Sequence, residues 1–185
     1  MTIQTKKLQA TLATPESIEP YGQLISTDRD VSNHIGDFYE GAVRVHDPIS
    51  FSSDDDTCLS LTSVDPRPLE VTYLERHFKH TQTFVPLGGK PYMVVLGAPT
   101  SGDLPEIESV RAFRFPGNTG LCMHIGTWHE FPFALENSTE MLVILRNETT
   151  RNLSGDNVVD GEAHGGDLDK KNIPKRIGIS LEVSL

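Results

Sequence analysis

The stretch VTYLERHFKHTQTFVPLGGKPYMVVLG, residues 71–97, decides the fold class of this chain. It holds three short runs of strand-forming residues, VTYLERH, TFVPL and YMVVL, and Gly88, Gly89 and Pro91 separate the second run from the third. Similar runs lie on both sides of it: CLSLTSV begins at residue 58, VRAFRF at 110 and MLVIL at 141. Short strands at this spacing predict an all-β fold, either a sandwich or a small barrel.

The two ends of the chain carry their own signals. Thr14-Pro15-Glu16 has the features of a helix start, and Pro20 ends that helix within about two turns. Apolar residues alternate with small or polar ones over 176–185, which predicts a half-buried strand that closes a barrel or pairs with another subunit. Residues 154–172 are rich in Gly, Asp and Asn, so we expect an exposed, flexible loop there, with an active-site lid as the alternative.

Length and charge limit the classes of function. A chain of 185 residues with no linker composition is expected to form a single domain over 1–185. The net charge is -10, with 16 Lys and Arg against 26 Asp and Glu, which argues against a nucleic-acid partner. A pocket for a small anionic metabolite remains compatible with this charge, because a few inward basic groups set the local field. No stretch is apolar enough for a leader or a membrane helix, so we expect a cytoplasmic protein without a membrane partner.

The residues that could carry chemistry form three clusters at the borders of expected strands. Phosphate-binding Gly-rich loops, Walker motifs, CxxC, HExxH and GxSxG are absent, so no nucleotide cofactor is expected. The clusters are Glu75-Arg76-His77 with His80 and Gln82, His124 to Glu130, and Arg44-Val45-His46-Asp47.

Strand geometry relates some of these residues. Gln82 and Phe84 lie two positions apart, so a strand places both side chains on one face. A single His is more often a surface or core residue than a catalyst, but His77 and His129 each stand beside a turn, which favours a shared pocket. His80 could be either a core residue or a site residue.

These segments resemble the cupin superfamily, whose fold is a double-stranded β-helix. His77, Gln82 and Gly89 fall at the second His, the Glu and the Gly of the first cupin motif, and Gly126 and His129 match the second motif. The resemblance implies a small barrel with metal ligands in its interior. Glu75 replaces the first His of the motif and Gln82 its acid, so the usual site of three His and one Glu is altered.

Within the cupins, the chain is similar to the ureidoglycolate lyase family over roughly residues 15–145. The similarity rests on six short motifs: Tyr21-Gly22, Arg44-x-His46-Asp47, Leu74-Glu75-Arg76-His77, Thr81-Gln82-x-Phe84-x-Pro86, Arg111-Ala112-Phe113 and His124-x-x-x-Trp128-His129. Family members commonly have another His after the Trp-His pair, where this chain has Glu130. The region after about residue 148 is also longer than in the family.

The resemblance implies a carbon–nitrogen lyase of allantoin degradation, in purine metabolism, that splits ureidoglycolate into glyoxylate and urea. This cleavage needs a base for the hydroxyl proton and an acid for the departing urea nitrogen. We assign the proton transfers to His124 and His129, with Glu130 as an orienting partner. Arg76 and Gln82 are expected to bind substrate, with Arg44 and His46 as further candidates.

Cofactor and subunit expectations follow from the same resemblance. A divalent metal, nickel or zinc, would be bound by His77, Gln82 and His129. A homodimer is expected by resemblance. Two other functions stay open: a cupin enzyme for a related hydroxy acid or carbonyl adduct, and a non-catalytic metabolite-binding cupin.

Overall fold

The computed structural model describes residues 3–34, 39–153 and 155–185, and strands dominate it. The helices are short: α1 (Pro15–Ile18), α3 (Asn147–Asn152) and α4 (Ile173–Ile177), with two 3-10 turns, η1 (Ile107–Ser109) and η2 (Gly155–Asn157). The all-β class predicted from the sequence is therefore confirmed. Among the described residues, no helix has the length and apolarity needed to cross a membrane.

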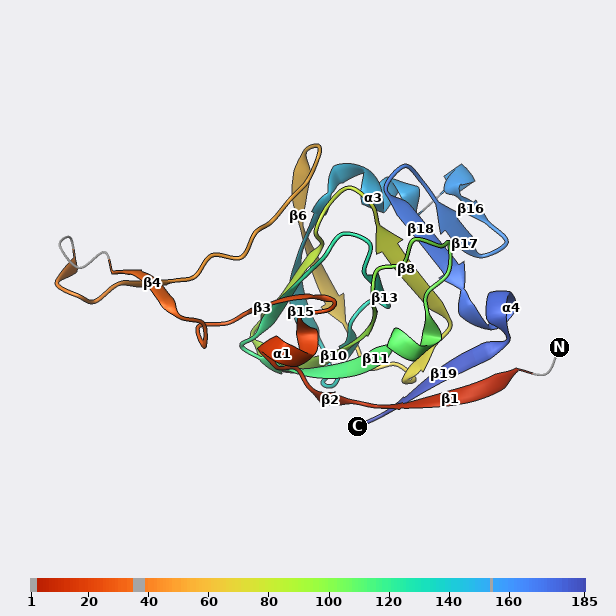
Figure 1. Ribbon diagram of the computed structural model, residues 1–185, viewed down its shortest axis with the longest axis horizontal. Coiled ribbons are helices and arrows are strands. Elements are labelled where there is room, and N and C mark those ends of the chain that lie inside the picture. Colours follow the sequence, from red (N-terminus) through yellow and green to blue (C-terminus); the bar gives the residue numbers. More distant parts are fainter. Residues whose placement is uncertain (1–2, 35–38, 154) are drawn as a thin grey trace.

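Two large sheets form the body of the molecule (Figure 1). The five-stranded sheet has the order β3 (Gly22–Ile25), β12 (Gly120–Met123), β9 (Thr83–Leu87), β15 (Thr139–Arg146) and β6 (Thr57–Val64). The path of the nine-stranded sheet is β16 (Val158–Val159), β17 (Glu162–His164), β18 (Leu168–Asn172), β8 (Tyr73–His77), β13 (Trp128–His129), β10 (Gly89–Gly97), β11 (Arg111–Gly117) and β2 (Thr11–Leu12); β14 (Phe133–Ala134) also pairs with β10.

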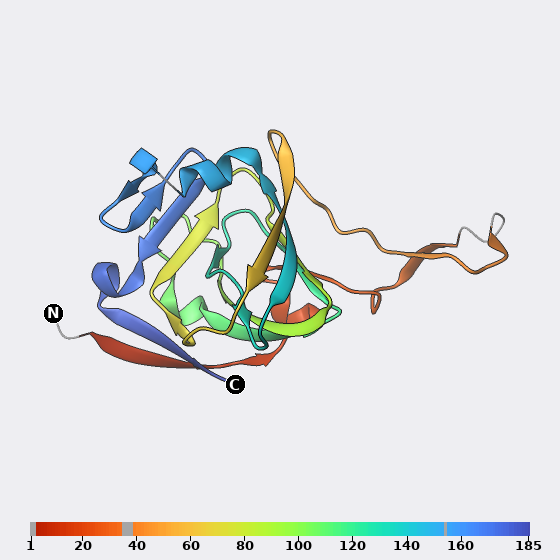
Figure 2. The ribbon, with the colours of Figure 1, turned by 180° about the vertical axis from the view of Figure 1, so that it is seen from behind.

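A third sheet covers the outer face of the nine-stranded one. It has the order β1 (Gln4–Gln9), β19 (Ile179–Ser184) and β7 (Glu70–Val71), so both ends of the chain lie side by side in it (Figure 2). β1 and β19 run parallel from Gln4↔Ile179 to Gln9↔Ser184. The strand expected in the C-terminal stretch is thus present as β19, after the short helix α4.

β10 shows why the body has two cores. Tyr92, Val94 and Leu96 belong to one buried cluster, which also takes side chains from β9, β11, β12 and β15. Met93 and Val95 point to the opposite face and pack in a second cluster with Leu181 and other residues of the three-stranded sheet. Side chains alternate along a strand, so a strand that is apolar at every position must be buried on both faces. The first core lies between the two large sheets.

The N-terminal helix forms where its capping signal predicts it. The Thr14 hydroxyl accepts a hydrogen bond from the Ser17 N–H, and the Ser17 hydroxyl accepts one from the Thr14 N–H. Gly22 follows at the start of β3, where a Cβ atom would lie 2.3 Å from the Cys122 carbonyl oxygen. Glycine is therefore required for the close approach of β3 and β12.

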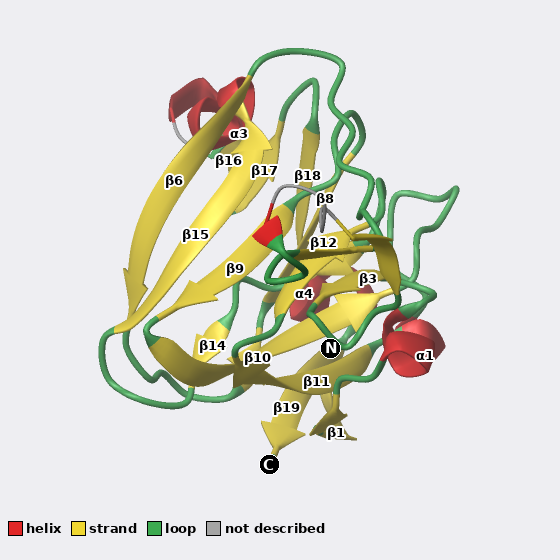
Figure 3. Cartoon of the chain, turned by 90° about the vertical axis from the view of Figure 1, so that its left-hand side faces the viewer, coloured by secondary structure: helices red, strands yellow, loops and turns green. Residues whose placement is uncertain are grey.

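A hairpin of β4 (Val31–His34) and β5 (Arg44–His46) projects from the body and is called the arm (Figure 1); Figure 3 shows the body from that side. It contains Arg44 and His46, two of the expected substrate-binding residues. In Figures 1 and 2 the arm extends well beyond the two large sheets. These two residues therefore lie on the arm and not on the strands that carry the other candidates.

The segment expected to be an exposed loop, 154–172, instead adds strands to the nine-stranded sheet. β18 pairs antiparallel with β8 from Leu168↔His77 to Asn172↔Tyr73. Several of its charged residues are buried with partners: Asp169 contacts Arg76 and Lys171, and Glu162 contacts Arg176, whereas Asp156 and Asp160 are exposed. Polar composition indicated solvent exposure, but ion pairs and hydrogen bonds satisfy these side chains inside the protein.

Candidate functional site

β8 separates its side chains into two groups. Leu74 belongs to the second core, and the Arg76 guanidinium on the same face lies 4.3 Å from the centre of the Trp128 ring. Glu75 and His77 point to the other face, towards the space between the two large sheets. β13 continues the pattern, because Trp128 packs in the second core while the His129 ring lies 6.2 Å from the ring of Phe84 in the first. Strand alternation therefore directs the acid and two imidazoles inward.

Three buried imidazoles gather at this place. The ring centre of His77 lies 4.7 Å from that of His80 and 5.2 Å from that of His129. Their exposed fractions are 3%, 0% and 1%. Each Nε2 atom is buried without a hydrogen-bond partner among the described residues, and so is the Gln82 Oε1 atom. Buried polar atoms are usually satisfied, so three such imidazole nitrogens at one place indicate a binding site.

The other ring nitrogen of each histidine has an oxygen partner. Nδ1 of His77 lies 3.3 Å from the Asp167 carbonyl oxygen, and Nδ1 of His129 lies 3.1 Å from that of Thr127. Nδ1 of His80 lies 2.7 Å from the Asp167 carboxylate. Because carbonyl and carboxylate oxygens accept, each Nδ1 donates, and a neutral imidazole then has a lone pair on Nε2.

Glu75 is an ionised acid beside these rings. Its Oε1 lies 3.4 Å from His129 Nε2, and its Oε2 accepts from Lys170 Nζ at 2.9 Å. Burial raises the pKa of the Glu75 carboxyl, but the contacts with His129 and Lys170 outweigh it, and the pKa falls well below its usual value. Burial lowers the pKa of His77, and the neighbouring His129 adds to this effect, so His77 is neutral at pH 7.

Glu130 lies at the border of the cluster. Its carboxylate accepts from Arg67 at 3.1 Å, and Arg67 also donates to the carbonyl oxygens of Phe131 and Pro132. Burial raises the pKa of Glu130, against the opposite effects of Lys170 and Arg67. A raised pKa keeps a carboxyl protonated to a higher pH than usual, which is the direction that a proton donor needs.

Two groups of residues have the geometry for a metal ion. The first group is Glu75, His77 and His129, and the second is His77, His80 and Asp167. Within each group the ligand atoms lie within 4.8 Å of one another. Both groups are buried. Imidazole nitrogen and carboxylate oxygen are ligands of zinc, nickel and related divalent ions, and the Gln82 oxygen would add a fourth donor.

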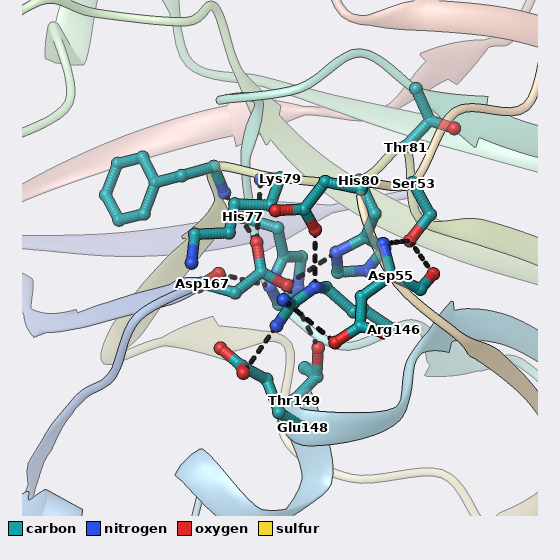
Figure 4. Close-up of polar contacts among 12 residues, drawn as sticks. Ser53, Asp55, His77, Lys79, His80, Thr81, Arg146, Glu148, Thr149 and Asp167 are labelled. Atoms are coloured by element: carbon teal, nitrogen blue, oxygen red, sulfur yellow. Dashed lines mark hydrogen bonds and ion pairs between the residues drawn. The ribbon is translucent and has the colours of Figure 1, made fainter.

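Asp167 anchors one side of this cluster (Figure 4). Burial raises the pKa of its carboxyl, but hydrogen bonds from His80 and from the Lys79 N–H outweigh this effect and the net pKa is lowered. Close to it, Arg146 forms ion pairs with Glu148 and Asp54. The cluster is thus bounded by fixed charges on the side of α3.

Several of the expected site residues lie elsewhere. Arg76 contacts Asp169 at 3.3 Å and donates to the Thr100 carbonyl oxygen, on the face of β8 away from the imidazoles. His124 is exposed, and its Nε2 donates to the Glu19 carbonyl oxygen. Arg44 is exposed on the arm, where His46 Nδ1 donates to the Arg29 carbonyl oxygen. Of the expected site residues, the structure therefore brings His77 and His129 together, and Glu130 directly follows His129. Gln82 is buried two positions before Phe84, whose ring lies 6.2 Å from that of His129.

Two residues of the cluster had no signal in the sequence. Asp167 and Lys170 belong to the polar segment that predicted a loop, and nothing in its composition indicates pairing with β8. His80 was left open and lies in the cluster. The proximity of His77 to an acid was visible, because Glu75 and His77 stand two positions apart in one strand.

A cavity of about 520 Å³ opens at another place. Its lining includes Leu12, Pro15, Leu24, Arg29 and Asp47, at the base of the arm. None of its lining residues belongs to the imidazole cluster, and none is a histidine. This cavity lacks the buried, unpaired imidazole nitrogens found between the large sheets, so we do not assign the active site to it.

The sequence is similar to those of a known protein family and of several named proteins. The sequence pattern of the family described as ureidoglycolate lyase matches residues 5–164. A ureidoglycolate lyase of Pseudomonas syringae pv. syringae (strain B728a) is 35% identical over 147 residues, which cover 77% of this chain and 84% of the relative. One of Escherichia coli O1:K1 / APEC is 33% identical over 145 residues, 76% of this chain and 88% of the relative. The chain therefore belongs to the ureidoglycolate lyase family.

Proposed function

We propose that the protein is a carbon–nitrogen lyase that cleaves ureidoglycolate to glyoxylate and urea. Membership of the ureidoglycolate lyase family supports the substrate. The observation that carries the chemistry is the group of three buried imidazoles whose Nε2 atoms have no hydrogen-bond partner among the described residues; that of His129 lies 3.4 Å from the Glu75 carboxylate. Such atoms are free to bind the polar groups of a small, oxygen-rich metabolite.

The reaction requires two proton movements. One base takes the proton of the substrate hydroxyl while the carbonyl of glyoxylate forms, and one acid protonates the urea nitrogen as the C–N bond breaks. In this proposal His129 accepts the hydroxyl proton, and the ionised Glu75 at 3.4 Å stabilises the imidazolium. Glu130, whose pKa is raised by burial, gives a proton to the leaving nitrogen. His124 has no part in this scheme because its ring lies outside the cluster.

The substrate carboxylate needs a cation on the same side as the imidazoles. Arg76 points to the opposite face of β8, whereas Lys170 is directed to the face of Glu75 and His77. We therefore assign binding of the substrate carboxylate, which the sequence suggested for Arg76, to Lys170, whose side chain is 25% exposed. Gln82 remains the candidate for a hydrogen bond to the hydroxyl or ureido group.

The residues present also fit a divalent metal. The unpaired Nε2 atoms of His77 and His129 and the Oε1 atom of Gln82 are the expected ligands, and Glu75 joins the two histidines in one ligand group. A bound nickel or zinc ion would act as a Lewis acid on a substrate oxygen. As a metal ligand, His129 could not take the hydroxyl proton, so the metal and the metal-free roles of His129 are alternatives.

Three further properties belong to this proposal. We propose a cupin-type barrel, which the first core between the two large sheets and the cupin motif positions of His77 and His129 support. We also propose a homodimer through β6, an edge strand on which Leu59 and Leu61 are 69% and 75% exposed. A cytoplasmic location remains a prediction from the sequence.

The test is release of glyoxylate from racemic ureidoglycolate by the purified protein, measured against the uncatalysed background. Parallel samples contain a chelator or added Ni²⁺. Rapid release supports the lyase, and its loss with chelator and recovery with Ni²⁺ would assign His129 to the metal. Release at the background rate in every sample would reject the proposed substrate.

A related substrate is the second candidate. Asp167 and Lys170 come from residues beyond the family match at 5–164, so part of this site is not shared through that match. A substrate with a different group opposite Lys170 is therefore the alternative, either another small hydroxy acid or a carbonyl adduct. The same assay with such compounds separates the two candidates.

A further inference from the structure

Asp167 is fully buried and every oxygen of its carboxylate has a donor. It lies in the turn between β17 and β18, at 0% exposure. Its Oδ1 accepts from the backbone N–H groups of Phe78 and Lys79, at 3.0 and 2.7 Å. Its Oδ2 accepts from His80 Nδ1 at 2.7 Å and from the Thr149 hydroxyl at 3.3 Å. Figure 4 shows Asp167 in the midst of these partners from separate segments.

The same residue orients a second imidazole. The backbone carbonyl oxygen of Asp167 lies 3.3 Å from Nδ1 of His77. The turn thus contacts two of the three rings, one through its main chain and one through its side chain. Residues that contact the outer nitrogen of a functional imidazole set its tautomer and its direction.

The hydrogen bonds at Asp167 leave one arrangement of protons on His80. Two backbone N–H groups hold Oδ1 as an acceptor, and the Oδ2 oxygen faces Nδ1 of a ring that is itself fully buried. Nδ1 must donate to a carboxylate, so the lone pair of the neutral ring is on Nε2. That Nε2 atom is buried and has no partner among the described residues, in the same cluster as Nε2 of His77.

We propose that Asp167 is a positioning residue of the site: it holds His80 as the Nδ1–H tautomer and makes its Nε2 a hydrogen-bond acceptor for a ureido N–H group of the bound metabolite. This inference deepens the proposed function and rests on it for the identity of the metabolite. Asp167 follows the last residue of the family match by three positions. The C-terminal part of the chain therefore completes the site as well as the sheet.

Asp167→Asn is the variant that tests the tautomer. Its amide oxygen can keep the bonds from the Phe78 and Lys79 N–H groups, and its NH2 group then faces Nδ1 of His80. Nδ1 has to accept in that case, so the proton moves to Nε2 and the lone pair is lost from the site. Thr149→Val is the matched control, because it removes one hydrogen bond to the same Oδ2 oxygen and leaves the imidazole partner in place.

The first measurement is the nitrogen NMR spectrum of the protein with ¹⁵N-labelled histidine, without substrate. For the wild type and Thr149→Val we expect an unprotonated Nε2 and a protonated Nδ1 on His80. For Asp167→Asn we expect the reverse. A protonated Nε2 in the wild type would overturn the proposal, even if the Asp167→Asn protein did not fold.

The second measurement is steady-state cleavage of ureidoglycolate by the same three proteins. Asp167→Asn should lose about 10- to 100-fold in kcat, as is typical for residues that orient a functional imidazole, with a smaller change in KM. Thr149→Val should stay within about twofold of the wild type. An unchanged kcat in Asp167→Asn with an inverted tautomer would contradict the role of His80 in the reaction.

The two measurements separate the inference from the proposed function. The spectrum needs no substrate, so it decides the tautomer whether or not the protein cleaves ureidoglycolate. If the expected tautomer is found and the wild type does not cleave ureidoglycolate, the positioning by Asp167 stands and the proposed substrate is rejected.

Discussion

Glu75 and Lys170 face each other across the β8–β18 pair, with Glu75 Oε2 2.9 Å from Lys170 Nζ. Glu75 belongs to the segment with the cupin-like motif, and Lys170 belongs to the C-terminal segment beyond the family match. Burial lowers the pKa of Lys170, but Glu75 outweighs this effect and the net pKa is raised. Both groups are therefore charged at pH 7 and form a direct ion pair beside the imidazoles.

Lys170→Met should weaken substrate binding more than turnover. Loss of the ammonium removes the proposed partner of the substrate carboxylate and leaves Glu75 buried without its cation. We expect KM to rise about tenfold or more and the free energy of unfolding to fall by about 1–3 kcal/mol. Lys170→Arg, which keeps the charge, is the control for kinetics and urea unfolding. An unaltered KM in Lys170→Met would remove Lys170 from the substrate site.

His129→Ala and His124→Ala should differ sharply. His129 lies in the buried cluster beside Glu75, whereas His124 is exposed and contacts the Glu19 carbonyl oxygen. We expect a loss of about 100-fold or more in kcat for His129→Ala and a change of less than about twofold for His124→Ala. Circular dichroism controls for folding. Equal losses of kcat in the two folded variants would support the catalytic role that the sequence suggested for His124.

Arg76→Met tests whether Arg76 is structural. Its guanidinium packs between the rings of Phe78 and Trp128 and pairs with Asp169. Removal leaves Asp169 buried with only Lys171 and His164 as ionic partners among the described residues, so we expect a loss of about 2–4 kcal/mol in urea unfolding. In the absence of urea, the KM of folded Arg76→Met should differ little from that of the wild type. A large rise in KM at unchanged stability would support the substrate-binding role expected from the sequence.

Glu162 should make stability depend on pH below 4.5. Hydrogen bonds from Arg176 lower the pKa of Glu162 to about 2. Because the pKa is lower in the folded protein than in the unfolded chain, this stabilisation is complete above about 4.5 and is lost as the pH falls towards 2. We expect about 1–2 kcal/mol, reduced by the partial exposure of Arg176. Urea unfolding at pH 6 and pH 3 should show a smaller difference for Glu162→Gln than for the wild type; equal differences would refute this role of Glu162.

The strand pattern and the helix cap were readable from the sequence. The run of strand-forming residues at 92–96 indicated a strand, and Thr14-Pro15-Glu16 indicated the start of α1. His77 and His129, which the sequence placed beside turns, lie with their ring centres 5.2 Å apart. These features depend on local propensity and on the two-residue period of a strand, which adjacent residues determine.

The same two-residue period places Arg76 and His77 apart. Adjacent residues of a strand point to opposite faces, so the two side chains cannot enter one pocket from β8. The sequence alone did not reveal which of the two faces the interior.

Only the tertiary structure decided which distant segments complete the site. The sequence by itself determined a β-rich chain and the strands that bring two imidazoles and Glu75 to one face. It did not determine that Asp167 and Lys170 join them, or that Arg44 and His46 lie on the arm. A polar segment such as 165–172 is stable inside the protein only when partners from β8 and α3 neutralise its charges, and those partners are distant in the sequence. Pairing of this kind depends on the three-dimensional register of β18 on β8, which local composition does not encode.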